Sequence, residues 1–197
     1  MKRVLFTGGG TGGHIYPALA IREILLKRFP EMVSGYLGLS DGMEAGIIKR
    51  LPDIPFLPVR AQGMPRTPSL KWFSFPLVNM IGFFEALSQI REFKPDLLVS
   101  TGGYVAFPAL LAATVLGIPF VIHEQNAAMG VTNRLFAGRA ARILLTYSEA
   151  YAESSDRVIF VGNPVRQAFL DAPPAQNRFK KNPGISGFSW SEVRGGH

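Results

Sequence analysis

Two glycine-rich turns have a composition that suits the binding of phosphate. The run GGGTGGH at residues 8–14 follows a short apolar segment, and the run STGGY at 100–104 follows another. Glycine lets backbone N–H groups approach an anion closely, and the N-terminus of a following helix favours negative charge. We therefore expect the two turns to bind two phosphates, or one diphosphate from two sides. The alternative is a pair of tight turns in which glycine serves packing alone.

Further polar residues lie beside these turns or follow other apolar segments. His14 ends the first turn and carries an imidazole, which can move protons near neutral pH. The run HEQN at 123–126 combines donors and acceptors typical of a sugar or polyol site, although a helix cap has the same composition. In the run NPVR at 163–166, Asn163 is a favoured N-cap and Arg166 opposes the helix dipole. Either an anionic partner or an ordinary surface position explains Arg166.

Residues 72–84 form an apolar stretch rich in aromatic side chains, with basic residues before and after it. A helix that is apolar all round is either buried or partly inserted in a membrane surface. Burial accounts for one side of this helix, and we favour membrane contact for the other. The residues expected in this membrane patch are Trp72, Phe73, Phe75, Ile81, Phe83 and Phe84.

The motifs lie between alternating strand and helix patterns. Apolar runs predict strands at 3–7, 34–39, 54–60, 96–100, 119–123, 143–147 and 157–161, and helical spacing predicts helices at 17–28, 76–93, 105–116 and 130–140. Pro55 and Pro58 place the third strand at a sheet edge, and Pro17 and Pro76 mark helix starts. This alternation predicts an α/β fold with a parallel sheet and right-handed crossovers.

Composition restricts the class of protein. The 197 residues carry a formal net charge of +7; 47% are hydrophobic, 18% are charged, and none is cysteine. One α/β domain, or one domain and part of a second, fits this length. Disulfides and thiolate metal sites are excluded, and the lack of a long basic run argues against nucleic acid. The N-terminus does not read as a signal peptide and no apolar run reaches about 18 residues, so we expect a cytosolic protein.

Together and in this order, the four motifs resemble the MurG family of peptidoglycan glycosyltransferases over residues 3–170. The resemblance implies a GT-B architecture, in which two Rossmann-like domains face each other across a cleft. Residues 1–170 would then be the N-terminal, acceptor-side domain, a Rossmann-like parallel sheet with helices on both faces. Residues 171–197 lose periodicity, and we expect an irregular tail left by a frameshift or truncation, with the C-terminal donor-binding domain absent.

The resemblance also implies a reaction and its partners. The family moves N-acetylglucosamine from UDP-N-acetylglucosamine to undecaprenyl-diphosphate-linked N-acetylmuramoyl-pentapeptide, with inversion, in the peptidoglycan synthesis on which cell shape and division depend. A peripheral location at the cytoplasmic face of the inner membrane follows, with the aromatic patch on anionic lipid. We expect no cofactor, and the lack of an Asp-x-Asp motif indicates no metal. Without a donor domain, the chain would be inactive alone.

The resemblance assigns roles to individual residues. The residues expected at the acceptor diphosphate are Gly9, Gly10, Thr101, Gly102, Gly103 and Tyr104. The residues expected at the sugar nucleotide are Thr11, Gly12, Gly13, Asn126 and Arg166. A general base must lie within hydrogen-bond reach of the attacking hydroxyl. His14 is the first candidate and Glu124 the weaker one, although His14 can also orient the glycine turn and Glu124 can support sugar binding.

Two other functions fit parts of the pattern. Gly8, Gly10 and Gly13 match the GxGxxG fingerprint of dinucleotide-binding domains, and Asp41 follows the second predicted strand, where such domains place an acid for the ribose. On that pattern the chain would be an NAD- or FAD-dependent oxidoreductase domain. The third hypothesis is a non-catalytic, membrane-associated module that binds polyprenyl diphosphate.

Overall fold

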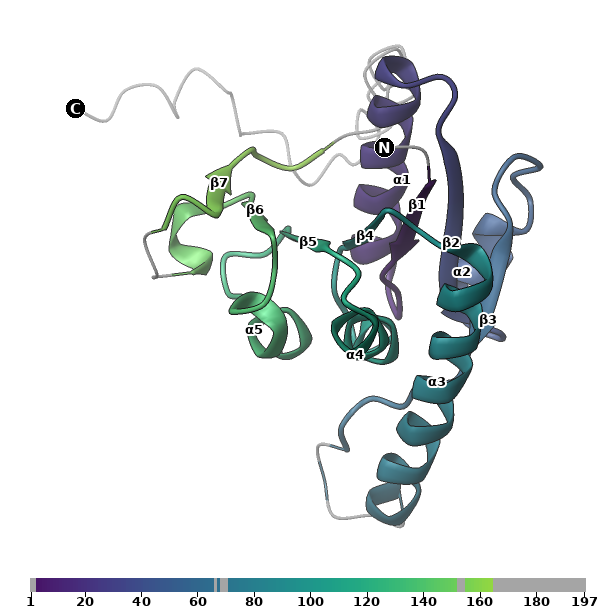
Figure 1. The fold of residues 1–197 in the computed structure, drawn as a ribbon. Coiled ribbons are helices and arrows are strands. Elements are labelled where there is room, and N and C mark those ends of the chain that lie inside the picture. The colour runs from purple at the N-terminus through teal and green to yellow at the C-terminus, as the bar shows by residue number, and fades with distance from the viewer. Residues whose placement is uncertain (1–2, 66, 68–70, 152–154, 165–197) are drawn as a thin grey trace, which may run out of the picture. The chain divides into compact units, whose positions relative to one another are not determined.

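A seven-stranded parallel sheet forms the centre of the chain (Figure 1). The computed structural model describes residues 3–65, 67, 71–151 and 155–164. The strands are β1 (Arg3–Thr7), β2 (Val33–Leu39), β3 (Phe56–Val59), β4 (Leu97–Ser100), β5 (Phe120–Glu124), β6 (Arg142–Leu145) and β7 (Val158–Phe160). They lie in the order β3-β2-β1-β4-β5-β6-β7. This order confirms the predicted parallel α/β sheet and the edge position of β3.

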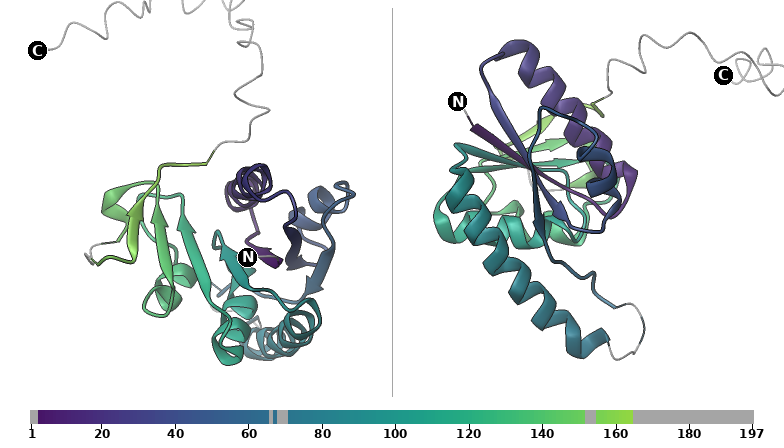
Figure 2. Two further views of the ribbon diagram at one scale, coloured as in Figure 1. Left: turned by 45° about the horizontal axis from the view of Figure 1, so that its top comes forward. Right: turned by 90° about the vertical axis from the view of Figure 1, so that its right-hand side faces the viewer.

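Helices cover both faces of the sheet, as predicted. They are α1 (Gly12–Arg28), α2 (Met43–Ile48), α3 (Lys71–Phe93), α4 (Ala106–Leu116), α5 (Val131–Ala137) and the 3₁₀ turn η1 (Ser148–Ala150). α3, α4 and α5 bury Ile90, Leu110 and Phe136 in one apolar core, whereas α1 and α2 bury Ile15 and Ile48 in another. Figure 2 shows α1 and α3 on opposite sides of the sheet.

The order in which the parallel strands are added reverses between β1 and β4. β2 and β3 follow β1 on one side of the sheet, and β4 to β7 lie on the other side. β1 pairs with β2 on one side and with β4 on the other, and β4 pairs with β5. Thr7 lies opposite Ser100, and Ser100 lies opposite Ile122, so the loops after β1, β4 and β5 start side by side. Ligands of open parallel sheets bind at such a reversal, beyond the carboxyl ends of the strands. The topology therefore brings both glycine turns and the HEQN run to one edge.

Two helices begin earlier than their prolines indicate. α1 starts at Gly12 rather than Pro17, and α3 starts at Lys71 rather than Pro76. Proline is favoured at the first helical position, but one turn further on it removes only one backbone hydrogen bond, which packing can offset. The first glycine turn therefore runs directly into α1. The six-residue α2 is too short for a periodic pattern, and the sequence did not predict it.

Some predictions fall on the C-terminal part of the chain. Asn163 and Pro164 have irregular structure. Arg166, the domain boundary at residue 170 and the tail at 171–197 lie outside the described residues.

Candidate functional site

The two glycine turns pack directly against each other. The first glycine loop (residues 8–13) follows β1, and the second glycine loop (residues 101–104) follows β4. The amide of Gly9 donates to the carbonyl of Gly102 at 3.3 Å. A Cβ on Gly103 would lie 2.3 Å from the Gly9 carbonyl oxygen, and Gly103 has a φ of +80°. Glycine is required here for both reasons, so the two loops fix each other's position.

The backbone donors best placed for an anion lie at the start of α1. The amide of Gly9 is already bonded to the second glycine loop, and the amide of Gly10 lies 3.4 Å from a carboxylate oxygen of Glu44. Gly12 and Gly13 begin α1, where backbone N–H groups have no acceptor inside the helix. The helix dipole adds partial positive charge at the same place. A phosphate at this edge therefore meets helix-terminal donors at Gly12 and Gly13.

His14 lies between the two loops, and its ring nitrogen Nδ1 is hydrogen-bonded to the second loop. Its Nδ1 is 2.8 Å from the Thr101 carbonyl oxygen, and the Thr101 hydroxyl donates to the His14 carbonyl at 2.7 Å. A proton on Nδ1 that is donated to Thr101 leaves the lone pair on Nε2. His14 is half-buried. Nε2 is therefore the ring atom that can accept a proton from a bound hydroxyl.

The side-chain amide of Gln125 supports the same ring. It lies 2.5 Å from Nδ1 of His14, and its Oε1 has no hydrogen-bond partner among the described residues. The oxygen and nitrogen of a side-chain amide are assigned from the hydrogen-bond network. If the Gln125 amide is rotated by 180°, its Oε1 accepts the proton on Nδ1 of His14. Gln125 then reinforces the tautomer that Thr101 selects.

Glu124 is a buried carboxylate with both oxygens engaged. It is 1% exposed. One oxygen accepts from the amide and the side chain of Asn126, at 3.0 and 2.9 Å. The other accepts from the Gly130 amide at 3.0 Å and from the Asn133 side chain at 2.9 Å. This arrangement holds the loop between β5 and α5 and leaves Asn126 exposed at the edge. Glu124 is thus placed to orient Asn126.

A second buried carboxylate, which sequence reasoning missed, lies behind the first glycine loop. Glu44 of α2 is fully buried, and its Oε1 accepts from the Leu39 amide at 2.9 Å. A Cβ on Gly9 or on Gly42 would come within 2.8 Å of the Glu44 carboxylate. The acidic, glycine-containing turn DGME at 41–44, just after β2, is the signal in the sequence that could have revealed it.

Tyr104 closes the second glycine loop as a neutral phenol. Its ring lies against Gly10, where a Cβ would come within 2.9 Å of it. Burial raises the pKa of Tyr104, and the negative charges of Glu44 and Asp41 raise it further. The phenol therefore keeps its proton at neutral pH and can donate it to an anion. Asp41 itself is exposed.

His123 differs from His14 in being fully buried. Burial lowers its pKa below the usual 6.5, so the ring is neutral at neutral pH. Nε2 faces the Gly162 carbonyl at 3.4 Å, and this contact, the charge of Glu124 and the Gln125 side chain partly offset the effect of burial on the pKa. His123 thus joins the end of β5 to the segment after β7.

The exposed face of α3 differs in detail from the predicted membrane patch. Trp72, Phe73 and Phe84 are exposed as expected. Phe75, Ile81 and Phe83 are half-buried, and Phe83 packs against the core. Leu77 and Met80 are exposed instead, so Phe73, Leu77, Met80 and Phe84 form one stripe at helical spacing. We call these four residues the α3 stripe.

α3 is also the one helix among the described residues that is long and apolar enough to cross a membrane, judged by length and composition alone. Its other face is part of the protein core. Ala86, Leu87 and Ile90 are buried there, and the Asn79 side chain donates to the Gln62 carbonyl at 3.0 Å. The apolar character of α3 therefore has two sources, a core face and an exposed stripe.

Comparison with known proteins identifies relatives of this chain. The model of the glycosyltransferase family 28 N-terminal domain matches residues 4–145. A protein of Desulforamulus reducens is 41% identical over 172 residues, which are 86% of this chain and 46% of that protein. A protein of Symbiobacterium thermophilum is 44% identical over 172 residues, with the same coverage. Both are named UDP-N-acetylglucosamine--N-acetylmuramyl-(pentapeptide) pyrophosphoryl-undecaprenol N-acetylglucosamine transferase.

Solved structures agree with these relatives. The crystal structure of Acinetobacter baumannii MurG matches with a TM-score of 0.68 and 31% identity, over 86% of this chain and 47% of that one. UDP-GlcNAc 2-epimerase from Neisseria meningitidis shares the fold, with a TM-score of 0.58 at 18% identity over 82% of this chain and 46% of that one. The chain spans about half the length of the curated relatives it matches.

Proposed function

The chain belongs to glycosyltransferase family 28 through its N-terminal domain, and we propose that it forms the acceptor-side half of an inverting N-acetylglucosaminyltransferase of peptidoglycan synthesis. The donor would be UDP-N-acetylglucosamine, and the acceptor N-acetylmuramoyl-pentapeptide on undecaprenyl diphosphate, as the names of the relatives indicate. The observation that carries the proposal is His14, held between two interlocked glycine loops by Thr101. Family membership speaks against the oxidoreductase hypothesis.

The proposed reaction needs a proton acceptor at this edge. The acceptor hydroxyl oxygen attacks the anomeric carbon of N-acetylglucosamine, the bond from that carbon to UDP breaks on the opposite side, and the configuration inverts. The hydroxyl proton passes to Nε2 of His14, because the contact with Thr101 keeps the Nδ1 position protonated and the ring oriented. Glu124, with both oxygens engaged, acts as a positioning residue for Asn126.

Anion binding in this proposal is divided among several groups. The α1 N-terminus, with Thr11, Gly12 and Gly13, offers amides and the helix dipole to a diphosphate. The second glycine loop adds the neutral phenol of Tyr104. Asn126 would bind sugar hydroxyls. Arg166, which lies outside the described residues, remains a proposed contact to the sugar nucleotide.

The α3 stripe supports a location of the protein at a membrane surface. A lipid-linked acceptor is reached at a membrane surface, and an exposed apolar stripe on a helix suits partial insertion there. Arg91 and Lys94 are exposed at the C-terminal end of α3 and would face anionic lipid headgroups. We place the protein as a peripheral protein at the cytoplasmic face of the inner membrane.

The first experiment tests acceptor binding by the full chain. Isothermal titration calorimetry with a geranyl-diphosphate-linked N-acetylmuramoyl-pentapeptide should show binding, and the same titration with NAD should show none. Binding of NAD without binding of the acceptor analogue would contradict the proposal.

The second experiment tests catalysis. The chain is supplied with the C-terminal half of the Desulforamulus reducens relative, and transfer of labelled N-acetylglucosamine to the acceptor analogue is measured. His14→Ala should lower kcat by about 10²–10⁴-fold with little change in acceptor KM, because a general base contributes on that scale. Lys27→Ala, in the last turn of α1, is the control and should match the wild-type chain. Acceptor binding without any transfer would favour the non-catalytic diphosphate-binding module.

A further inference from the structure

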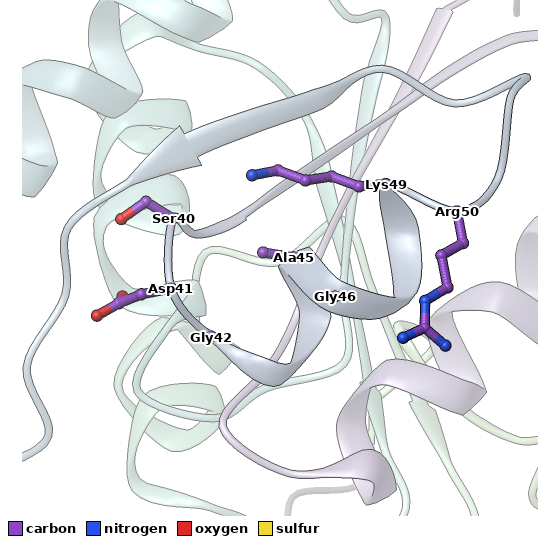
Figure 3. A pocket seen from close by; sticks show the side chains of 7 residues that line it. All are labelled: Ser40, Asp41, Gly42, Ala45, Gly46, Lys49 and Arg50. Carbon is purple, nitrogen blue, oxygen red and sulfur yellow. The ribbon is translucent and has the colours of Figure 1, made fainter.

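A cavity of about 490 Å³ opens between the end of β2 and α2 (Figure 3). Nothing in the proposed reaction uses it so far. Its lining residues all belong to one segment, and they are Ser40, Asp41, Gly42, Ala45, Gly46, Lys49 and Arg50. The segment follows the strand next to β1, at the same edge of the sheet as the two glycine loops.

The cavity lies directly behind the first glycine loop. Gly42 is part of its wall, and a Cβ on Gly42 would come within 2.8 Å of the Glu44 carboxylate. A Cβ on Gly9 would come within 2.8 Å of the same carboxylate. The loop and the wall of the cavity are therefore separated by the thickness of one side chain. Asp41, at the cavity, is also close enough to Tyr104 for its charge to raise the pKa of that phenol.

Two exposed basic side chains line the cavity. Lys49 and Arg50 are exposed, and neither has an ion-pair partner among the described residues. Figure 3 shows the Lys49 side chain extending over the cavity toward Ser40, whereas the neighbouring Arg50 side chain points away from Lys49. The Lys49 ammonium lies 5.5 Å from the centre of the Phe56 ring, a contact that limits its freedom. Asp41 is the single acid in the lining, and the buried Glu44 carboxylate behind Gly42 accepts from the backbone amides of Gly10 and Leu39.

We propose that this cavity binds the carboxylate groups of the acceptor's peptide. The inference rests on the proposed function, because that function places a diphosphate at the loops and a pentapeptide on the attached sugar. A peptide joined to the sugar through its N-terminus keeps at least its C-terminal carboxylate. Five extended residues reach up to about 17 Å, well beyond the thickness of the side chain between loop and cavity. Lys49 and Arg50 then supply the cations that a carboxylate pairs with.

The test compares two acceptor probes by titration calorimetry on the full chain. One is the geranyl-diphosphate-linked N-acetylmuramoyl-pentapeptide, and the other is the same molecule without its peptide. The Lys49→Ala/Arg50→Ala variant should bind the peptide-bearing probe about tenfold more weakly and the peptide-free probe within twofold of wild type, as expected for two exposed charge pairs. The tenfold difference should shrink at high salt.

A matched variant controls for net charge. Lys27→Ala/Arg28→Ala removes the same two charges from the last turn of α1, about 24 Å along the helix from Gly12. It should bind both probes as the wild-type chain does. Thermal unfolding of each variant establishes that all three proteins are equally folded at the titration temperature.

The outcomes separate this inference from the proposed function. If wild type binds neither probe, the proposed function and the inference both fail. If wild type binds both probes equally, or if the Lys49/Arg50 variant weakens both to the same extent, the peptide site fails and acceptor binding stands. Weaker binding of UDP-N-acetylglucosamine by that variant, with the peptide effect absent, would assign the cavity to the nucleotide and overturn the inference.

Discussion

The glycine-loop edge of the sheet and the α3 stripe are both candidate binding surfaces, but they are built in opposite ways. At the loop edge the polar groups are buried and bonded, as Thr101 and Glu124 show with at most 1% exposure. On the stripe, Phe73 and Phe84 are 82% and 61% exposed. The first surface is rigid because each group has several partners, whereas the second is held only through the opposite face of its helix.

This difference fits the functions proposed for the two surfaces. Transfer chemistry needs a base and a diphosphate site that are held in fixed geometry, and buried hydrogen bonds can hold them so. Substitution of a residue in such a buried network destabilises the protein. A lipid surface has no fixed geometry, so exposed apolar area is enough. Substitutions at the loop edge should therefore reduce stability and function together, and substitutions on the stripe should reduce binding alone.

Gly103→Ala should have the largest effect on stability. Its Cβ would lie 2.3 Å from the Gly9 carbonyl oxygen, and its φ of +80° is unfavourable for alanine, so the loops must separate. We expect a loss of at least about 3 kcal/mol in the free energy of unfolding, measured by urea denaturation. Gly138→Ala is the control, because a Cβ there meets nothing within 4 Å, and it should be neutral or slightly stabilising. Equal stability of the two variants would show that the loops are not tightly coupled.

Glu124→Ala should be next in size. It removes the carboxylate that accepts from the Gly130 amide and from the buried Asn133 side chain, which costs about 2–4 kcal/mol. Glu149→Ala, an exposed acid in η1, is the matched control and should change the free energy of unfolding by less than about 0.5 kcal/mol. If Glu124→Ala were as stable as the control and lost only transfer activity, Glu124 would be a base rather than a positioning residue.

The sequence predicted the framework of the loop edge because the framework depends on local patterns. Strand positions followed from apolar runs, and α4 ends at Gly117, whose φ of +68° suits glycine. Parallel topology then placed the glycine turns side by side. The partners of Glu124 were not predictable, since Asn133 lies nine residues away and reaches the carboxylate only through the packing of α5. The burial of Glu44 was missed because an acid on a short helix is usually exposed.

On α3 the sequence predicted the helix but not its orientation. A helix with apolar residues all round gives no periodic signal for the face that meets the core. The sequence therefore predicts Phe83 in the membrane patch, whereas it packs inward, and does not predict that Leu77 and Met80 are exposed. Only the packing of α3 on α4 and β3 decides between the faces.

The buried His123 should give a moderate, pH-dependent effect. Its folded pKa is below 6.5, so below pH 6.5 the unfolded chain binds a proton that the folded chain does not. Stability should be fully present above pH 6.5 and fall by up to about 1.4 kcal/mol per pH unit as the pH drops toward the lowered pKa. The measurement is the free energy of unfolding from pH 7.5 to 5. His123→Gln should remove this part of the slope, and an unchanged slope would show that other groups produce it.

Substitution of the α3 stripe should have the smallest effect on stability and a large effect on lipid binding. Phe73→Ser/Leu77→Ser/Phe84→Ser removes exposed apolar area, so the free energy of unfolding should change by less than about 1 kcal/mol. Flotation with phosphatidylglycerol vesicles should fall to the level seen with neutral phosphatidylcholine vesicles. Val115→Ser/Val131→Ser is the control, because both valines are exposed and belong to α4 and α5 rather than to the stripe. If the stripe variant floated as well as this control, the contrast between a rigid chemical site and an apolar lipid-binding face would be lost. If it unfolded, the stripe would belong to the core.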